Sequence, residues 1–256
     1  MANNTRSSSG RRFTTRFFVN EDTLVVDLMK RRRALSSAPR LGGLVTARSI
    51  INHQVPDNPV PRHESGKKGR RQWGDPARYL GLVARSLAAP EPCVGLMTAV
   101  LMRRLIVLRE ESGELWIEGF LTVGVTNAVR AGHAAAHHPA GATGTINMIL
   151  ITNAALSASA MVTLVQVATE SKTAALLAHG VKTWTGQPGA TGTGTDAVVV
   201  VSGDGPATKY GGTHTRIGAL VGRLVMKGVT RGLSMSRSRG SRRRDDAMNQ
   251  LRAIND

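Results

Sequence analysis

The chain has 256 residues, of which 41% are hydrophobic, a single cysteine and a formal net charge of +17 at pH 7. This length and apolar content are sufficient for one large hydrophobic core. One cysteine, Cys93, excludes an internal disulfide framework and a cysteine-based zinc site, and it indicates a reducing, cytoplasmic environment.

The positive charge is concentrated at the two ends of the chain. Residues 86–233 contain 11 Lys/Arg and 8 Asp/Glu, whereas residues 1–85 contain 17 and 6, and residues 234–256 contain 6 and 3. We therefore expect a disordered basic N-terminus at 1–18, one domain at 19–233 and a flexible basic tail at 234–256. Aromatic residues make up only 4% of the chain, so base stacking is poorly supported and nucleic acid is not expected as the primary partner.

The first half of the chain predicts a series of strands. A strand is expected at 44–51, followed by a loop or insertion at 56–76 that is rich in proline, glycine and basic residues. A short helix should begin after Asp75 and Pro76, because Asp can cap a helix and Pro fits its first turn. Extended segments follow at 94–100, 105–110 and 115–123, and Ser112-Gly113 separates the last two as a hairpin turn does.

The second half predicts two more strands, at 145–151 and 197–201, and two long helices. One helix is expected from the capping residue Ser157 to His179, where Gly180 stops it, and the other at 215–229. Because strands precede the helices, we predict an α+β fold, a single-domain layered sandwich in which a mixed β-sheet packs with helices. Proline and glycines interrupt the uncharged stretch between Arg130 and Glu170, so no membrane span is expected.

Five segments in the second half combine small residues with polar ones at the ends of apolar runs. They are TVGVTNAVRAG (122–132), GTINMILITNA (144–154), TESKTAALLAHG (169–180), ATGTGTDAVVVVSG (190–203) and GGTHTRIGALVGR (211–223). Backbone amides and short polar side chains of this kind build ligand pockets. The chemistry is therefore expected between residues 122 and 223.

The segment ATGTGTDA suits the binding of an oxyanion or a polar substrate. Its glycines let backbone amides converge, and its hydroxyls and carboxylate can position water. The residues expected to act here are Thr191, Gly192, Thr193, Gly194, Thr195 and Asp196. A tight turn into a buried strand is an equally good interpretation of the segment, and a nucleophilic threonine is an open alternative.

Two further residues are candidates for proton transfer. His214 stands just before an apolar helix, where its neutral form can accept a proton. Glu170 and Lys172 are the two formal charges of the 157–179 helix, and an isolated Glu among small residues can be poised for proton transfer. The competing interpretations are a capping or surface histidine and a solvated helix face.

Amide and guanidinium side chains are candidates for substrate binding. Asn127, Arg130, Asn147 and Asn153 can form paired hydrogen bonds with amide or carboxylate groups, although asparagines at strand ends are more often turn formers. His133, His137 and His138 have no nearby carboxylate and no helical context, so no metal site is predicted. Cys93 is expected to be a small core residue.

Taken together in order and spacing, the five segments resemble the adenosylcobinamide amidohydrolase family of corrinoid salvage. The resemblance covers about residues 39–229 and includes the earlier segments LGGLVTARSIINHQVP and VGLMTAVLMRRLIVLRE. Two positions depart from the family pattern, His133 after VRAG and Ala219 in the last helix, where the family commonly has acidic residues. These departures concern peripheral contacts more than the reaction.

The resemblance implies hydrolysis of the amide that joins aminopropanol to the corrin ring, which gives adenosylcobyric acid and 1-amino-2-propanol. The partner is then a corrinoid substrate; its cobalt belongs to the substrate, and no enzyme cofactor is expected. For this reaction we predict His214 or Glu170 as base and acid, Asp196 as the residue that orients them, and the Gly192 to Gly194 amides with Lys172 or Asn127 as oxyanion donors.

Two other functions are compatible with the same sequence features. A corrinoid-binding protein without activity would use the same pocket, and the release of aminopropanol distinguishes it from an enzyme. A nucleic-acid-binding protein would depend on the basic ends, so deletion of residues 1–18 and 234–256 should abolish its affinity.

Overall fold

A computed structural model describes residues 13–55, 75–134 and 144–255 of the chain, with side chains as far as residue 236. Its centre is an eight-stranded sheet in the order β4-β3-β2-β11-β8-β6-β5, with β1 paired to β2. The pairs β3–β4 and β8–β11 are parallel and the others are antiparallel, so the sheet is mixed. The strands are β1 (Arg16–Asn20), β2 (Thr23–Ser36), β3 (Gly43–Gln54), β4 (Cys93–Thr98), β5 (Ile106–Ser112), β6 (Leu115–Val123), β8 (Ile146–Thr152) and β11 (Ala197–Val201).

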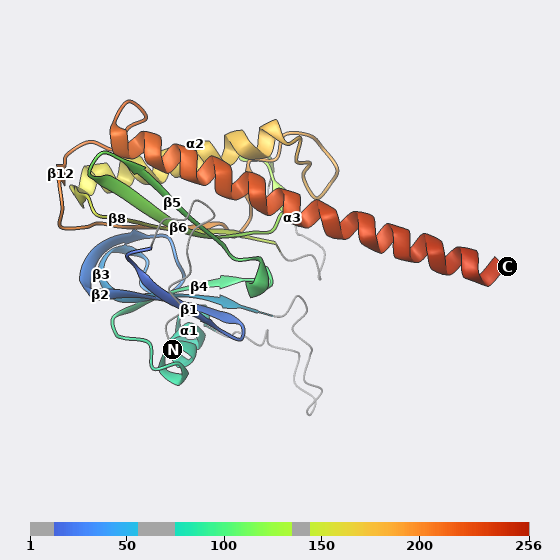
Figure 1. Ribbon diagram of the computed structural model, residues 1–256, viewed down its shortest axis with the longest axis horizontal. Helices are drawn as coiled ribbons and strands as arrows, with labels where there is room; N and C mark the ends of the chain where they lie inside the picture. Colours follow the sequence, from blue (N-terminus) through green and yellow to red (C-terminus); the bar gives the residue numbers. More distant parts are fainter. Residues whose placement is uncertain (1–12, 56–74, 135–143, 256) are drawn as a thin grey trace.

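Three helices cover the sheet on two sides. Figure 1 shows α2 (Ala158–Ala178) and α3 (Arg216–Asn255) over β5, β6 and β8, with the strands β1 to β4 below and α1 (Pro76–Ser86) beneath them. Two pairs of two-residue strands link the loops at the two ends of this sandwich. One pair is β7 (Ala128–Val129) with β10 (Gly192–Thr193), and the other is β9 (Ala155–Leu156) with β12 (Ala207–Thr208). The predicted α+β layered sandwich with a mixed sheet is confirmed.

A bulge in β2 allows the sheet to fold over itself. The register of β2 against β3 shifts between Asp27 and Arg32, and Met29 within this segment has a φ of 64°. Bulges bend a strand and increase its twist. The first part of β2 therefore pairs with β1, whereas its last residues pair with β11. As a result β4 faces β8, and Asn147 Nδ2 of β8 donates a hydrogen bond to Met97 O of β4.

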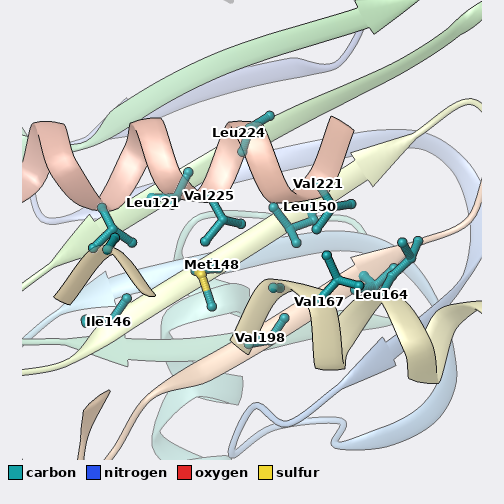
Figure 2. Packing of buried hydrophobic residues seen from close by; sticks show 14 of the residues in the cluster. Leu121, Ile146, Met148, Leu150, Leu164, Val167, Val198, Val221, Leu224 and Val225 are labelled. Atoms are coloured by element: carbon teal, nitrogen blue, oxygen red, sulfur yellow. The ribbon is translucent and has the colours of Figure 1, made fainter. Parts of the chain in front are cut away.

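Apolar side chains fill the spaces between the layers. The largest cluster lies between the sheet and the two long helices, and Figure 2 shows Met148 and Leu150 of β8 facing Val221 and Val225 of α3. A second cluster fills the inside of the folded sheet, with Phe17 and Phe120 in edge-to-face contact at 4.9 Å between ring centroids. A third cluster, which includes the buried Cys93, holds α1 against β3 and β4.

The helix signals read from the sequence are present. Asp75 caps α1 by accepting a hydrogen bond from Ala77 N, and Pro76 occupies its first turn. Ser157 caps α2 by accepting from Ala160 N, and His179 follows its last residue. These local contacts fix where each helix starts, and the clusters of apolar residues fix which face is buried.

Several boundaries differ from the sequence predictions. The strand β1 lies partly inside the 1–18 segment that we expected to be disordered, and β2 was not predicted because its arginine run, Arg31 to Arg33, interrupts the apolar pattern. The last helix continues to Asn255 rather than ending at 229, since Arg, Met, Ala, Leu and Gln favour helix and no proline interrupts them. The insertion at 56–74 lies outside the described residues.

Candidate active site

A cavity of about 310 Å³ opens where the parallel strands β8 and β11 begin. We call it the amide pocket, because asparagine and threonine side chains supply its polar groups. It is lined by Pro39, Val55, Pro76, Met97, Thr98, Ala99, Asn127, Gly144, Thr145, Asn147, Thr195 and Ala197. None of these residues has a titratable side chain, so within the described part of the chain the lining is neutral.

A buried chain of hydrogen bonds runs beneath the amide pocket and joins strands that are distant in the sheet order. Asn147 Nδ2 donates to Asn52 Oδ1 at 2.9 Å and to Met97 O at 2.7 Å. Asn52 Nδ2 donates to Thr122 Oγ1 at 3.1 Å, which in turn donates to Thr98 Oγ1 at 3.3 Å. Both amide hydrogens of Asn147 are therefore in use, and this side chain positions its neighbours rather than offering a free donor.

Thr145 carries a buried and hydrogen-bonded hydroxyl in the lining of the amide pocket. Its side chain is buried, and Oγ1 lies 2.9 Å from Thr195 O and 3.3 Å from Asn147 Oδ1. These two acceptors share the single hydroxyl proton, so the lone pairs of the oxygen are left for another partner. A fixed, buried hydroxyl in a neutral cavity is suited to attack a carbonyl carbon or to align a water molecule.

Asn127 and Gly144 form one wall of the amide pocket. The Asn127 Oδ1 atom is buried and has no hydrogen-bond partner among the described residues. A Cβ atom at position 144 would lie 2.6 Å from Asn127 Oδ1 and 2.9 Å from Thr126 N. Only glycine therefore fits at 144, because its neighbours include fixed backbone.

A buried ion pair supports the floor of the site. Lys172 Nζ of α2 donates to Asp196 Oδ2 at 2.5 Å, and the two side chains are only 9% and 11% exposed. Asp196 Oδ1 also accepts from Ile146 N at 2.9 Å and from Thr193 Oγ1 at 2.5 Å. The carboxylate thus ties the first residue of β8 to the glycine-rich loop, in the neighbourhood of Thr145.

The glycine-rich loop is organised around this carboxylate. A Cβ atom at Gly192 would lie 2.6 Å from Asp196 Oδ2 and 2.8 Å from Lys172 Nζ, so the ion pair needs glycine there. Thr193 N donates to Asp196 Oδ2, and Thr195 N donates to Thr193 Oγ1. Thr193 N, one of the amides predicted as oxyanion donors, therefore already has an acceptor inside the loop, and so does the adjacent Thr195 N.

A second cavity, of about 330 Å³, lies on the other side of the same loop. Gly194, Arg130, His133 and Trp184 contribute to its lining, whereas the adjacent Thr195 lines the amide pocket. Arg130 Nη1 donates to Gly189 O at 3.1 Å, and Thr191 Oγ1 accepts from Ala131 N at 2.8 Å. The structure thus brings Asn127, Asn147 and Thr195 together at one cavity and Arg130 and Gly194 at its neighbour.

Three of the candidate residues lie away from the amide pocket. Glu170 and His214 are exposed, and neither lines a cavity described above. His214 follows β12, which lies at the carboxyl end of β8, whereas the amide pocket lies at the amino end of β8. Because β8 has seven residues, its two ends are about 20 Å apart. Asn153 is also at that end, where its amide bonds Trp116 N and Glu114 O in the β5–β6 turn region.

Titratable groups near the site are few. Burial raises the pKa of the Cys93 thiol to about 11, so this thiol is a neutral core group. Burial also lowers the pKa of His53, whose ring nitrogens contact Thr23 Oγ1 and Tyr79 Oη. Among the described residues no three His, Cys, Asp or Glu side chains are placed to hold a metal ion; His137 and His138 lie outside these residues.

Sequence reasoning did not single out Thr145, Thr98 or Asn52. They stand at the ends of apolar strands, where a polar side chain is common, and only the folding of the sheet brings them together. The one local signal was the Gly-Thr pair at 144–145, directly before an apolar strand.

The chain is similar in sequence to a known protein family and to two individual proteins. A family model described as adenosylcobinamide amidohydrolase matches residues 5–241. An uncharacterized protein of Methanocaldococcus jannaschii is 30% identical over 230 residues, which cover 82% of this chain and 85% of that protein. A Methanosarcina mazei protein named adenosylcobinamide amidohydrolase is 31% identical over 204 residues, covering 76% of this chain and 86% of its own length.

Among solved structures, a β-aminopeptidase of a Burkholderia species is similar over 91% of this chain and 82% of its own, with a TM-score of 0.42 and 12% identity. A likeness of this degree carries no conclusion about the site. No helix within the described residues is both long and apolar enough to cross a membrane.

Proposed function

The chain belongs to the adenosylcobinamide amidohydrolase family, and from this premise we propose that it hydrolyses the aminopropanol amide of adenosylcobinamide. Water adds across the C–N bond, so the corrin ring keeps a carboxylate as adenosylcobyric acid and 1-amino-2-propanol leaves with the proton. The observation that carries the proposal is the family match over residues 5–241, a range that includes every residue lining the amide pocket.

The size and chemistry of the amide pocket support the binding of a side arm rather than a whole corrinoid. A cavity of about 310 Å³ is at the lower limit for small-molecule sites. Its neutral lining of apolar groups with a few amides and hydroxyls matches a neutral amide linked to a short amino alcohol. In this proposal the arm enters the amide pocket and the ring stays outside it, near the cavity lined by Arg130 and Trp184.

For the chemical step we propose two alternatives for the Thr145 hydroxyl. It attacks the amide carbonyl to form an ester, its proton leaves with the amine, and water then cleaves the ester to give the carboxylic acid and the free hydroxyl; or it aligns a water molecule that attacks the carbonyl directly. Of the three lining hydroxyls, Thr195 is exposed, and the buried Thr98 Oγ1 already accepts from Val100 N and Thr122 Oγ1, which leaves the buried Thr145 hydroxyl as the candidate. The Lys172–Asp196 pair keeps the start of β8 in place through the bond from Ile146 N to Asp196. Proton transfer by His214 and Glu170 stays a prediction that their variants test.

The activity is tested by incubating the purified chain with adenosylcobinamide, with and without a chelator, and separating the products by chromatography with mass detection. We expect adenosylcobyric acid and aminopropanol, and the chelator arm shows whether a metal is required. Binding of unchanged substrate, seen as a change in the corrin absorption spectrum, would instead support a corrinoid-binding protein without activity.

The role of Thr145 is tested with two variants that keep its volume or its hydroxyl. We expect Thr145→Val to lose at least about a hundredfold in turnover, whereas Thr145→Ser keeps part of it. Intact-mass detection of an acylated chain after rapid quenching would identify Thr145 as the nucleophile rather than as a group that aligns water. Full activity of Thr145→Val, together with loss of activity in His214→Ala and Glu170→Gln, would move the chemistry to the latter pair.

A further inference from the structure

A further cavity, of about 390 Å³, lies at the opposite end of β8 and β11, and its lining is charged rather than neutral. We call it the arginine pocket. It is lined by Arg31, Arg32, Arg33, Ala155, Leu156, Ser157, Ser202, Gly203, Asp204, Ala207, Thr208 and Lys209. Four of these side chains are cationic, and one is anionic.

The positive charge in the arginine pocket has little compensation. Its carboxylate, Asp204, forms an ion pair with Lys30, which lowers the pKa of Asp204. Among the described residues Arg31 and Arg33 form no side-chain hydrogen bond or ion pair, and Lys209 contacts the Tyr210 ring at 5.6 Å. Cations gathered around a cavity create a positive potential inside it. An anion bound there is attracted by all of them and reduces their mutual repulsion.

Arg32 is the most buried of these cations, and carbonyl groups rather than carboxylates hold it. Its Nε donates to Ser202 O at 2.7 Å, and its Nη2 donates to Thr152 O. These carbonyls mark the carboxyl ends of β11 and β8, so the guanidinium is fixed at the mouth between the two strands. Burial lowers the pKa of Arg32, and the nearby carboxylates of Asp204 and Glu118 act in the opposite direction.

The start of α2 adds hydrogen-bond donors on the same side. Ser157, which lines the arginine pocket, caps α2, so the first amides of the helix lie next to the cationic side chains. The positive end of the helix dipole and exposed N–H groups favour phosphate-like ligands when cations accompany them. The helix end therefore adds to the positive charge that the arginines place around the cavity.

We propose that the arginine pocket binds a phosphate group, either free phosphate or the phosphate of a larger metabolite. Arg31 and Arg33 supply charge-assisted hydrogen bonds to the anion, and Arg32 forms the fixed base of the site. The site is separated from the amide pocket by the length of β8. It is therefore independent of the amidohydrolase proposal, and either can fail without the other.

The test is isothermal titration calorimetry of the full chain with inorganic phosphate in a chloride buffer at constant ionic strength. We expect one site, and the double variant Arg31→Ala/Arg33→Ala should weaken its affinity by about tenfold or more. The matched control is Arg85→Ala/Arg231→Ala, which removes two exposed arginines elsewhere and leaves the same net charge. This control should bind phosphate as the unaltered chain does.

Titrations with AMP and ATP distinguish the two sources of the phosphate. Tighter binding of a nucleotide than of inorganic phosphate, lost in the arginine pocket variant alone, assigns the site to a phosphorylated metabolite; equal affinities assign it to phosphate itself. No heat with any of these ligands overturns the proposal. An equal loss of affinity in both double variants also overturns it, since only overall charge would then matter.

Discussion

The two ends of the strand pair β8 and β11 carry opposite kinds of chemistry. At the amino end, the amide pocket is neutral, and the nearest charges, Lys172 and Asp196, are buried and neutralise each other. At the carboxyl end, the arginine pocket gathers three exposed cations and the partly buried Arg32 around one carboxylate that is already paired. Two kinds of site are therefore kept apart in the fold. Changing the buried ion pair beside the amide pocket should lower the free energy of unfolding strongly, whereas the exposed side chains of the arginine pocket contribute little to it.

The largest effect is expected from breaking the buried pair at the amino end. Lys172→Ala or Asp196→Ala should each lower the free energy of unfolding by about 3–5 kcal/mol, because the remaining charge is left buried without its partner. Denaturant unfolding monitored by circular dichroism measures this. Lys182→Ala removes an exposed lysine and should change the stability by less than about 0.5 kcal/mol. Stability within about 1 kcal/mol of the unaltered chain for both pair variants would show that the pair is not structural.

A smaller effect is expected from crowding the same pair without removing it. Gly192→Ala places a methyl group against Asp196 Oδ2 and Lys172 Nζ, and overpacking of this kind costs about 1–3 kcal/mol. Gly194→Ala is the matched control in the same loop, since a Cβ there meets nothing within 4 Å and the residue has no positive φ. Equal melting temperatures for the two variants would contradict the proposed packing of the loop.

At the carboxyl end, loss of a helix cap should have a moderate effect. Ser157→Ala removes the acceptor of Ala160 N at the start of α2, which should lower the stability by about 1 kcal/mol. Ser159→Ala, one residue into the exposed first turn, is the control and should be close to neutral. Thermal unfolding compares the two, and a Ser157→Ala variant as stable as Ser159→Ala would contradict the capping role of Ser157.

The smallest effect, and the one of opposite sign, is expected in the arginine pocket. Arg31→Ala/Arg33→Ala relieves repulsion between exposed cations, so the stability at low salt should stay within about 0.5 kcal/mol of the unaltered chain or rise slightly. Any gain should disappear near 1 M salt, where charges are screened within about 3 Å. A clear loss of stability at low salt would show that these arginines form structural contacts.

The agreement between sequence and structure is best where the signal is local. The apolar segments at 115–123 and 197–201 are β6 and β11, and the caps Asp75 and Ser157 begin α1 and α2. The prediction missed β2, because Arg31 to Arg33 interrupt its apolar pattern and because the pairing that stabilises it with β3 and β11 is not local. Residue composition alone does not reveal such pairing.

For the site, the sequence supplied the residue types and the tertiary structure supplied their grouping. The segments that contain Asn127, Asn147, Lys172, Asp196 and Thr195 were recognisable in the chain by their small and polar residues and by their order, which also indicated the family. Which of them share a cavity, and that Thr145 joins them while Asn153 does not, depends on the bend of β2 and on the direction of β8. Local patterns follow from the preferences of neighbouring residues, whereas a site assembled from several strands depends on contacts between residues far apart in the chain.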